Sequence, residues 1–417
     1  MSASAPSRTD TTPTLPMLVG TWFLVVLSVV SWRPDTLYAG GADPVVIAKA
    51  LVALTAFLCA LAIYRQHRMH ARVGIRSLSF LIAIVAVSCL GAVAAGDPMP
   101  SLVLAVRIIL VAATVYTLTC TTTPLDVLRS LLIAMGILSL IGAVTGIPEF
   151  LAEGRLASGI PAMRPNELAG LSAPPLVGLA IEVTRAGLRT RTAVLMLTFS
   201  VIVLATGSRT TLFVAVLAIM LAIMLSWPLP HSAGIVLILL APVTYTIVAF
   251  TDFVAQVAVR GQDLQQLATL SSRTIAWEAV LAIPMNTWHK WIGAGLAIKT
   301  VEVDQRWWET QVLDSSWVSV LSQAGILGLV LVSLWVLLTV IESARSDRLR
   351  NLTFPLLVLL LVRSVAENGL IESSVIFVLF FCISLMLEPG YRYPFPHQKP
   401  ARYPLVQTAR SGVGWPG

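Results

Sequence analysis

Arginines at the borders of long apolar runs are the residues of this sequence whose chemistry stands out. Arg209 lies in TGSRT, between two apolar runs. Arg155 and Arg164 lie in GRLASGIPAMRPNELAG, and Arg273 lies in LSSRTIAW. A guanidinium stays charged at physiological pH and offers paired planar donors that suit phosphate oxygens. These residues predict a site for an anionic ligand, although a single arginine at a span end can also snorkel to the interface.

Two further arginines lie inside apolar runs. Arg363 is followed four residues later by Glu367 in LLLVRSVAENGLIESS, so the two can pair on one helical face. A structural ion pair therefore stays open as the alternative to a binding role. Arg107, in SLVLAVRIILVAA, has no such neighbour and is the better candidate for a ligand contact.

The composition is that of a membrane protein with several spans. The chain has 417 residues, of which 57% are hydrophobic and 12% charged, and its mean hydropathy is +0.85. The net charge of +7 is assigned to loops that orient helices, because no basic stripe is interleaved with aromatics as in nucleic-acid-binding proteins. All four cysteines fall in apolar runs, so neither a disulfide framework nor a metal site is indicated. No cofactor is expected, and GAGLA at 293–297 is interpreted as a turn rather than a nucleotide loop.

The predicted fold class is all-α and polytopic, with about 12 transmembrane helices. The expected spans lie near 17–32, 44–64, 77–95, 101–120, 127–147, 166–184, 192–206, 210–226, 233–251, 316–341, 352–371 and 373–388.

The distribution of basic residues orients these spans. With the N-terminus inside, most arginines fall on the inner connections, which predicts that both termini are cytoplasmic. The expected organisation is a disordered tail at 1–16, helices 1–9 at 17–251, a long outer loop at 252–315, helices 10–12 at 316–388, and a cytoplasmic tail at 389–417.

The long outer loop is expected to cover a site, because a structureless loop of this length is uncommon in a compact protein. Its segment SSRTIAWEAVLAI predicts an amphipathic helix on the membrane surface, capped by Ser271 or Ser272 and stopped by Pro284. Glu278 is expected to face solvent. The apolar face of that helix is expected to consist of Ile275, Ala279 and Ala282.

Four segments in this order resemble the superfamily of O-antigen ligases and O-antigen polymerases. They are RLASGIPAMRPNELAG with Arg155, Gly159 and Asn166, then TGSRT with Arg209, then SSRTIAWEAVL followed by IGAGLA, and finally LDSSWVSVLSQAGILGLVL. The resemblance covers roughly residues 150 to 335. Each segment alone is weak, and their order and expected side of the membrane make the match more specific.

The resemblance implies a GT-C-like membrane glycosyltransferase of the bacterial cytoplasmic membrane, with its active site facing outward. Its donor would be a glycan on a polyprenyl diphosphate such as undecaprenyl diphosphate, its acceptor a glycan, lipid or protein, and no metal would be needed. The family's diphosphate-binding role falls on Arg209 and Arg273, and then on Arg155 and Arg164. Arg107 joins them as a donor contact. Ser208, Asn166, Arg363 and Glu367 would support the site.

Such a reaction needs a base for the acceptor hydroxyl. Many family members have a histidine eleven residues before the glycine of the AGILGL segment, where this chain has Asp314. The related peptidoglycan polymerases of the SEDS type use an aspartate in a similar outer position, so Asp314 is the predicted base. Its alternative role is a helix N-cap, because DSSWVSV precedes a span. His289 in NTWHKW is the competing base, and Glu302, Asp304 and Glu309 are weaker candidates.

Two other functions stay open. A transporter also has many spans and intramembrane charges, although no half-to-half repeat is visible here. A flippase or scaffold would bind lipid diphosphates without turnover. Within the enzyme hypothesis, the sequence does not separate a ligase from a polymerase.

Overall fold

The computed structural model describes residues 13–33, 43–66, 71–226, 271–303 and 310–392. The predicted span at 233–251, the part of the outer loop at 252–270, Asp304 and Glu309, and most of both tails lie outside these ranges. The side chain of Arg273 lies outside them as well, although its backbone belongs to a helix.

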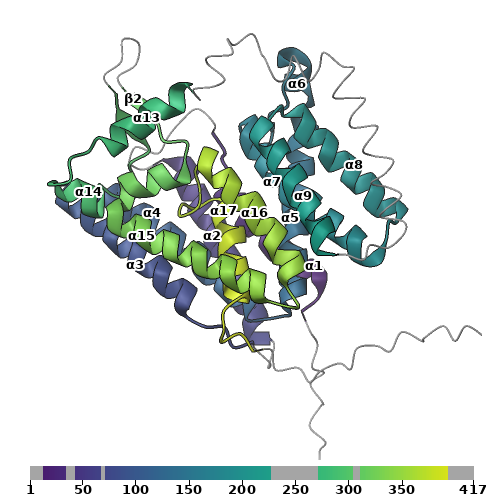
Figure 1. The fold of residues 1–417 in the computed structure, drawn as a ribbon. Helices are drawn as coiled ribbons and strands as arrows, with labels where there is room; N and C mark the ends of the chain where they lie inside the picture. Colours follow the sequence, from purple (N-terminus) through teal and green to yellow (C-terminus); the bar gives the residue numbers. More distant parts are fainter. Residues whose placement is uncertain (1–12, 34–42, 67–70, 227–270, 304–309, 393–417) are drawn as a thin grey trace, which may run out of the picture.

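The described part of the chain is mostly helical, and each predicted span within it coincides with a helix (Figure 1). The long helices are α1 (Leu15–Val29), α2 (Pro44–Gln66), α3 (Arg76–Ala94), α4 (Pro98–Thr119), α5 (Pro124–Thr145), α7 (Pro165–Ala186), α8 (Thr190–Ala205), α9 (Arg209–Leu225), α15 (Ser316–Arg345), α16 (Arg350–Ala366) and α17 (Val375–Met386). Shorter elements are α6 (Ile147–Glu153), α13 (Ser271–Leu281), α14 (Trp288–Ile292), β1 (Thr300–Glu302) and β2 (Thr310–Val312).

Five of the described helices, α2, α3, α4, α5 and α15, are long and apolar enough to cross a membrane. Helices α1, α8, α9 and α17 are apolar but shorter. The total of twelve crossings and the orientation of the bundle stay predictions.

Proline marks the start of several helices. A proline lies in the first turn of α1, α4, α5 and α7, where its missing N–H costs no intrahelical hydrogen bond. Helix α5 is also capped, because the Thr123 hydroxyl accepts the N–H of Asp126 at 3.2 Å. Local sequence signals therefore set these helix starts.

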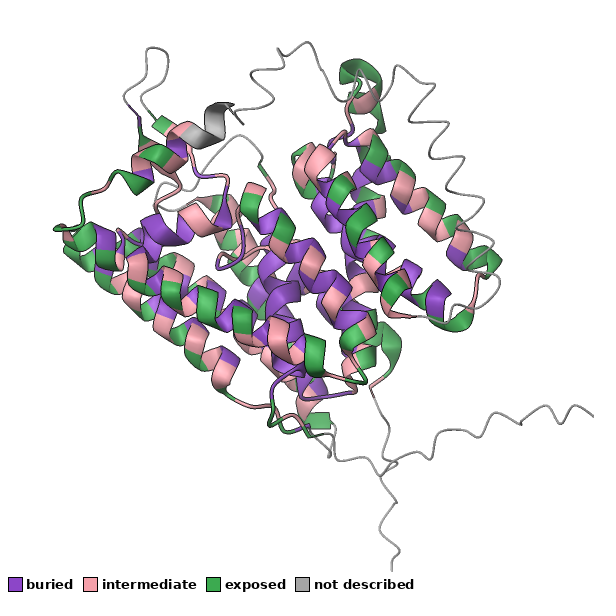
Figure 2. Ribbon diagram, viewed as in Figure 1, coloured by how far each residue is buried: buried purple, intermediate pink, exposed green. Residues whose placement is uncertain are grey.

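Helix α17 lies at the centre of the bundle (Figures 1 and 2). Every residue from 376 to 386 is buried, and a helix that is apolar all round needs such surroundings. It packs against α4, α16 and α5, and makes smaller contacts with α1, α3 and α7. Trp335 of α15 meets Phe380 edge-on at 4.9 Å and donates its indole N–H to Ser384 at 2.7 Å.

Helix α17 is shorter than the hydrocarbon core of a bilayer is thick. Twelve residues rise about 18 Å, whereas the hydrocarbon core of a bilayer is about 30 Å thick. The preceding residues 367–374 are not helical. Irregular backbone at membrane depth is tolerated only inside protein or along a water-filled cavity. A crossing at α17 would therefore place residues 367–374 inside protein or along a water-filled cavity.

Helix α15 is broken near its start. The described part of the predicted outer loop, residues 271–303 and 310–315, is called the outer segment here, and it docks into this break. Gly325 has φ 66° and ψ −166°, which separates the first residues of α15 from the rest. The N–H groups of Ala294 and Gly295 donate to the carbonyls of Ser322 and Gln323 at 2.9 and 3.0 Å. A side chain at Gly325 would collide with the backbone of Trp291, so only glycine permits this contact.

Helix α13 confirms the helix that the sequence predicts there, but its buried face differs. Ala276 and Val280 are buried and pack with Leu313 and Leu321, whereas Ala282 is exposed and lies beyond the helix. The predicted face of Ile275, Ala279 and Ala282 is therefore wrong by one position. The reason is that α13 packs on α15 and on the two-stranded hairpin β1–β2, which the sequence patterns did not indicate. Glu278 is exposed, as predicted.

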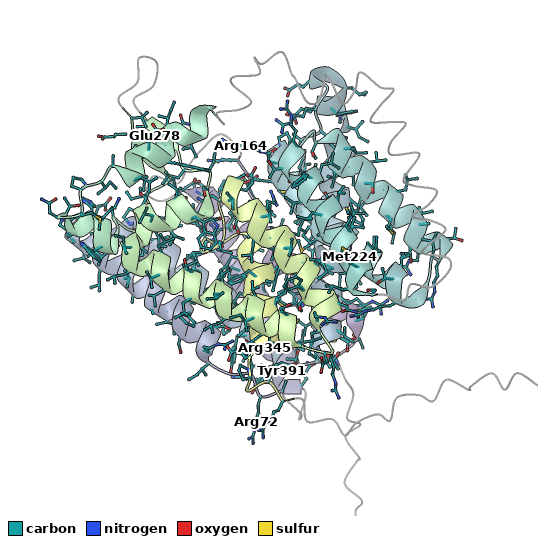
Figure 3. The ribbon with its side chains drawn as sticks, viewed as in Figure 1. Arg72, Arg164, Met224, Glu278, Arg345 and Tyr391 are labelled. Atoms are coloured by element: carbon teal, nitrogen blue, oxygen red, sulfur yellow. The ribbon has the colours of Figure 1, made fainter. Side chains whose placement is uncertain are left out.

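The opposite end of the bundle is held by ion pairs and caps. Arg76 donates to both carboxylate oxygens of Glu342, at 2.6 and 2.5 Å. The carboxylate of Glu388 accepts the N–H groups of Arg76 and Ser77 at the start of α3, where negative charge is favourable. Figure 3 shows Arg345 and Tyr391 at this end, and Arg164 and Glu278 at the other.

Candidate functional site

A cavity of about 460 Å³ lies where α17 begins. Its wall is built from the end of α1, the starts of α2 and α7, the middle of α4, the segment before α15, the end of α16 and the residues that lead into α17. The charged residues in this lining are Arg33, Lys49, Arg107, Arg164, Lys299, Arg363, Asp43, Glu167, Asp314, Glu367 and Glu372. The cavity at the start of α17 is thus strongly polar.

Asn166, in the first turn of α7, joins three of the predicted site residues. Its side-chain oxygen accepts from Arg155 at 2.9 Å, and its side-chain nitrogen donates to Glu367 at 2.9 Å. Its backbone carbonyl accepts from Arg363 at 2.6 Å. Arg155 also donates to the carbonyl of Thr206 at 2.7 Å, which ties the 155–164 segment to the TGSRT turn.

Arg363 and Glu367 do not meet on one helical face as predicted. Helix α16 ends at Ala366, and Glu367 is extended, with φ −138° and ψ 140°. Asn166 links the two residues, because Arg363 donates to its carbonyl and Glu367 accepts from its side chain. Arg363 itself is buried, and Gly170 on α7 makes room for its guanidinium.

Glu372 is the centre of a second network at the cavity wall. Its carboxylate pairs with Lys299 at 2.5 Å and accepts from Gln323 at 2.9 Å and from Asn368 at 2.7 Å. Burial alone would raise the pKa of Glu372, but Lys299 and the two amide donors outweigh it and lower that pKa below its ordinary value. The carboxylate is therefore ionised at neutral pH. The network connects the outer segment, the broken part of α15 and the approach to α17.

Asp314 lies in the cavity lining, at the end of the outer segment. The neighbouring Leu313 is buried, and its N–H donates to the carbonyl of Lys299 at 2.9 Å. Ser315, rather than Asp314, holds the N-cap position of α15. The structure thus favours the cavity position over the capping role for Asp314.

Arg164 and Arg107 also line the cavity. The backbone N–H of Arg164 donates to the carboxylate of Glu167 at 3.2 Å, which orders the start of α7. Arg107 donates through one terminal nitrogen to the carbonyl of Ser28 at 2.6 Å. Its Nε atom is buried and has no hydrogen-bond partner among the described residues.

Three other predicted site residues lie elsewhere in the described structure. Arg209 begins α9 and Ser208 holds its N-cap position, and neither is part of the described cavity lining. The Ser208 hydroxyl donates to Thr211 at 3.0 Å. His289 is exposed on α14 and stacks on Trp288, with ring centroids 3.7 Å apart. The structure therefore does not bring His289 to the cavity.

The sequence interpretation missed Lys49, Lys299 and Glu372. Lys49 lies inside the predicted span at 44–64, and a lysine in a span is itself a signal of function. Lys299 and Glu372 belong to different connections, and only the docking of the outer segment brings them together. No local pattern marks such a pair.

The sequence matches no known protein-family model, and no curated protein is similar to it.

Proposed function

We propose that this chain is a membrane glycosyltransferase that moves a glycan from a polyprenyl diphosphate to an acceptor hydroxyl at the outer face of the cytoplasmic membrane. The observation that carries this proposal is the joint presence of Asp314 and several buried or half-buried basic side chains in one cavity. Ligase and polymerase activities share this chemistry and differ in the acceptor.

The reaction makes two demands that these residues suit. The acceptor oxygen forms a bond to the anomeric carbon while the bond from that carbon to the phosphate oxygen breaks. Negative charge develops on the leaving polyprenyl diphosphate, and fixed cations in a water-poor site stabilise it, each by about 3 to 4 kcal/mol. In this account Arg107, Arg164 and Arg363 supply that charge, and the carboxylate of Asp314 takes the acceptor's proton.

The roles that the family resemblance gives to Arg209 and Arg273 are part of the same proposal. The TGSRT turn is tied to the cavity wall through Arg155, which donates to both Thr206 and Asn166. A donor longer than the cavity would extend past this turn. Arg209 is therefore assigned to the donor's approach, and Arg273 keeps the diphosphate-binding role that the resemblance implies.

A transfer assay tests the proposed function. Purified protein is incubated with a labelled pool of lipid-linked oligosaccharides and candidate acceptors, and labelled products are identified by mass. We expect the label to leave the polyprenyl carrier and to appear on a glycan, lipid or protein. Label that stays on the carrier under all these conditions would contradict the proposal.

A transporter or flippase is the second candidate, favoured by one observation. Helix α17 is short and begins beside a charged cavity, and transporters commonly bind substrates at such discontinuous helices. Reconstitution into vesicles with labelled lipid-linked oligosaccharide separates the two functions. A flippase changes the leaflet of the label without changing the molecule that carries it.

A further inference from the structure

Lys49 is a cation inside the bundle that the described part of the protein leaves unpaired. It lies on α2, is half-buried and lines the cavity. Arg107, Glu167 and Asp43 are close enough to act on its ammonium group electrostatically. None of the described carboxylates lies within ion-pair distance of it. An ammonium at this depth is costly, and lysines in such positions commonly serve a substrate.

Arg107 lines the same cavity as Lys49 and also lacks a carboxylate partner in the described structure. Its one described hydrogen bond goes to the carbonyl of Ser28, and its buried Nε has no partner in the described ranges. Glu372 acts on it electrostatically, but that carboxylate is already engaged by Lys299 and two amides. Two neighbouring cations without a dedicated carboxylate repel each other, and an anion between them would relieve this repulsion.

The start of α17 completes the same wall. Ser373, Val375 and Ile376 line the cavity. The Ser374 hydroxyl already accepts the N–H of Phe377 at 3.1 Å, whereas the N–H groups of Val375 and Ile376, in the first turn, have no partner within the helix. The Ser373 hydroxyl is buried without a hydrogen-bond partner in the described structure. The N-terminal end of a helix also carries partial positive charge. A hydroxyl donor and a helix terminus therefore line the same cavity as Lys49 and Arg107.

Two other cations of the cavity lie in ion pairs with carboxylates. Lys299 pairs with Glu372 at 2.5 Å, and Arg33 pairs with Asp43 at 3.5 Å. Lys299 and Arg33 thus each have a carboxylate partner in the described structure, which Lys49 and Arg107 do not.

We propose that Lys49, Arg107 and the start of α17 form a subsite for a phosphate group. Two cations, a hydroxyl and helix N–H groups match the several oxygens of a phosphate, whereas a single carboxylate would use fewer of them. The subsite rests on the proposed function for the larger ligand, a lipid diphosphate, but a phosphate would bind there without any transfer.

Binding measurements test this subsite independently of turnover. Wild-type protein in detergent is titrated with inorganic pyrophosphate and with a short-chain prenyl diphosphate, and dissociation constants are measured by calorimetry. We expect Lys49→Gln and Arg107→Gln each to weaken prenyl diphosphate binding at least about tenfold, because each removes a charged hydrogen bond. Lys49→Arg keeps the charge and should restore most of the affinity. Arg65→Gln removes the same charge from the last turn of α2 and is the matched control.

The two probes also identify the source of the phosphate. Comparable affinities for both would assign the subsite to phosphate as such, and much tighter binding of the prenyl compound would assign it to a lipid headgroup. The proposal is overturned if wild-type protein binds neither probe, or if Lys49→Gln binds as tightly as Arg65→Gln. Glycan transfer measured on the same variants tests the proposed function separately. A failure of the binding prediction can therefore be distinguished from a failure of the transfer prediction.

Discussion

Asn166 is the residue on which the polar wall of the cavity converges. It accepts from Arg155, donates to Glu367 and offers its carbonyl to Arg363. These partners come from the segment before α7 and from the end of α16. A single amide therefore aligns a carboxylate and two guanidiniums without contributing any charge.

Substitution of Asn166 by alanine should destabilise this wall. The change removes an acceptor from Arg155 and a donor from Glu367, and such losses at buried polar groups cost about 1 to 3 kcal/mol. We expect a lower free energy of unfolding in detergent together with reduced glycan transfer. Asn351→Ala, near the start of α16, is the control and should leave both unchanged. Equal behaviour of the two variants would remove Asn166 from the site.

Glu372 should make the stability of the protein depend on pH in the acid range. Because folding lowers its pKa below 4.5, the unfolded chain binds more protons between the two values. The contribution of the ionised carboxylate is fully present above pH 4.5 and is lost as pH falls through the lower, folded value.

Thermal denaturation of wild type and Glu372→Gln tests this dependence. The wild type should have the higher Tm at neutral pH, and the difference should shrink on acidification below about pH 4.5, because both proteins then carry a neutral side chain. Glu302→Gln, an exposed position on β1, should show no such convergence. A difference that is constant across the range would contradict the assigned ionisation.

At the residue scale, the sequence indicated part of the site. The motif GRLASGIPAMRPNELAG predicted Arg164 and Asn166, and the position of the family histidine, eleven residues before Gly325, predicted Asp314; all three line the cavity. Lys49 was not predicted as a site residue because the span at 44–64 was interpreted by hydropathy alone. The Lys299–Glu372 pair could not be predicted from the sequence, because it joins two connections that are distant along the chain.

At the scale of elements, the break in α15 holds the outer segment in place. The backbone of residues 294 and 295 binds the carbonyls exposed at that break, and Gln323 donates to both Ile298 and Glu372. The break thus positions Lys299 and the residues that lead to Asp314.

Alanine at Gly325 should release the outer segment. A Cβ atom there would collide with the backbone of Trp291, and φ 66° is itself unfavourable for alanine. We expect a lower Tm and faster proteolysis between α13 and α15. Gly20→Ala is the matched control, since nothing lies within 4 Å of that position. Equal proteolysis of the two variants would show that the contact does not hold the segment.

Hydropathy predicted the helices well, because a bilayer-sized apolar run has few other structures available. It did not predict where helices stop inside the bundle. The span expected at 352–371 ends at Ala366 in α16, and the next helix begins only at Val375. These ends depend on tertiary contacts, such as the Ser316 hydroxyl that donates to the carbonyl of Glu367 at 2.8 Å.

At the scale of the whole molecule, the two ends of the bundle carry different charged residues. Arg72 and Arg345 lie at one end, and Arg164 and Glu278 lie at the other (Figure 3). The positive-inside rule predicts that the end with Arg72 and Arg345 lies in the cytoplasm. The cavity would then face outward.

Cysteine labelling tests this orientation. In a background without the native cysteines, Glu278→Cys should react with a membrane-impermeant maleimide in intact cells. Arg345→Cys should react only after the cells are permeabilised. Both positions are exposed, so access is set by the membrane alone. The reverse pattern would place the cavity on the cytoplasmic side and remove the proposed outer-leaflet reaction.

The central claim is that Asp314 takes a proton in a cavity that holds a lipid diphosphate. The most direct test compares Asp314→Asn with Asp347→Asn, an exposed control at the other end of the bundle, in both glycan transfer and prenyl diphosphate binding. We expect Asp314→Asn to lose transfer by at least about a hundredfold and to bind as wild type does, while the control keeps both. Transfer by Asp314→Asn at the rate of the control would contradict the account.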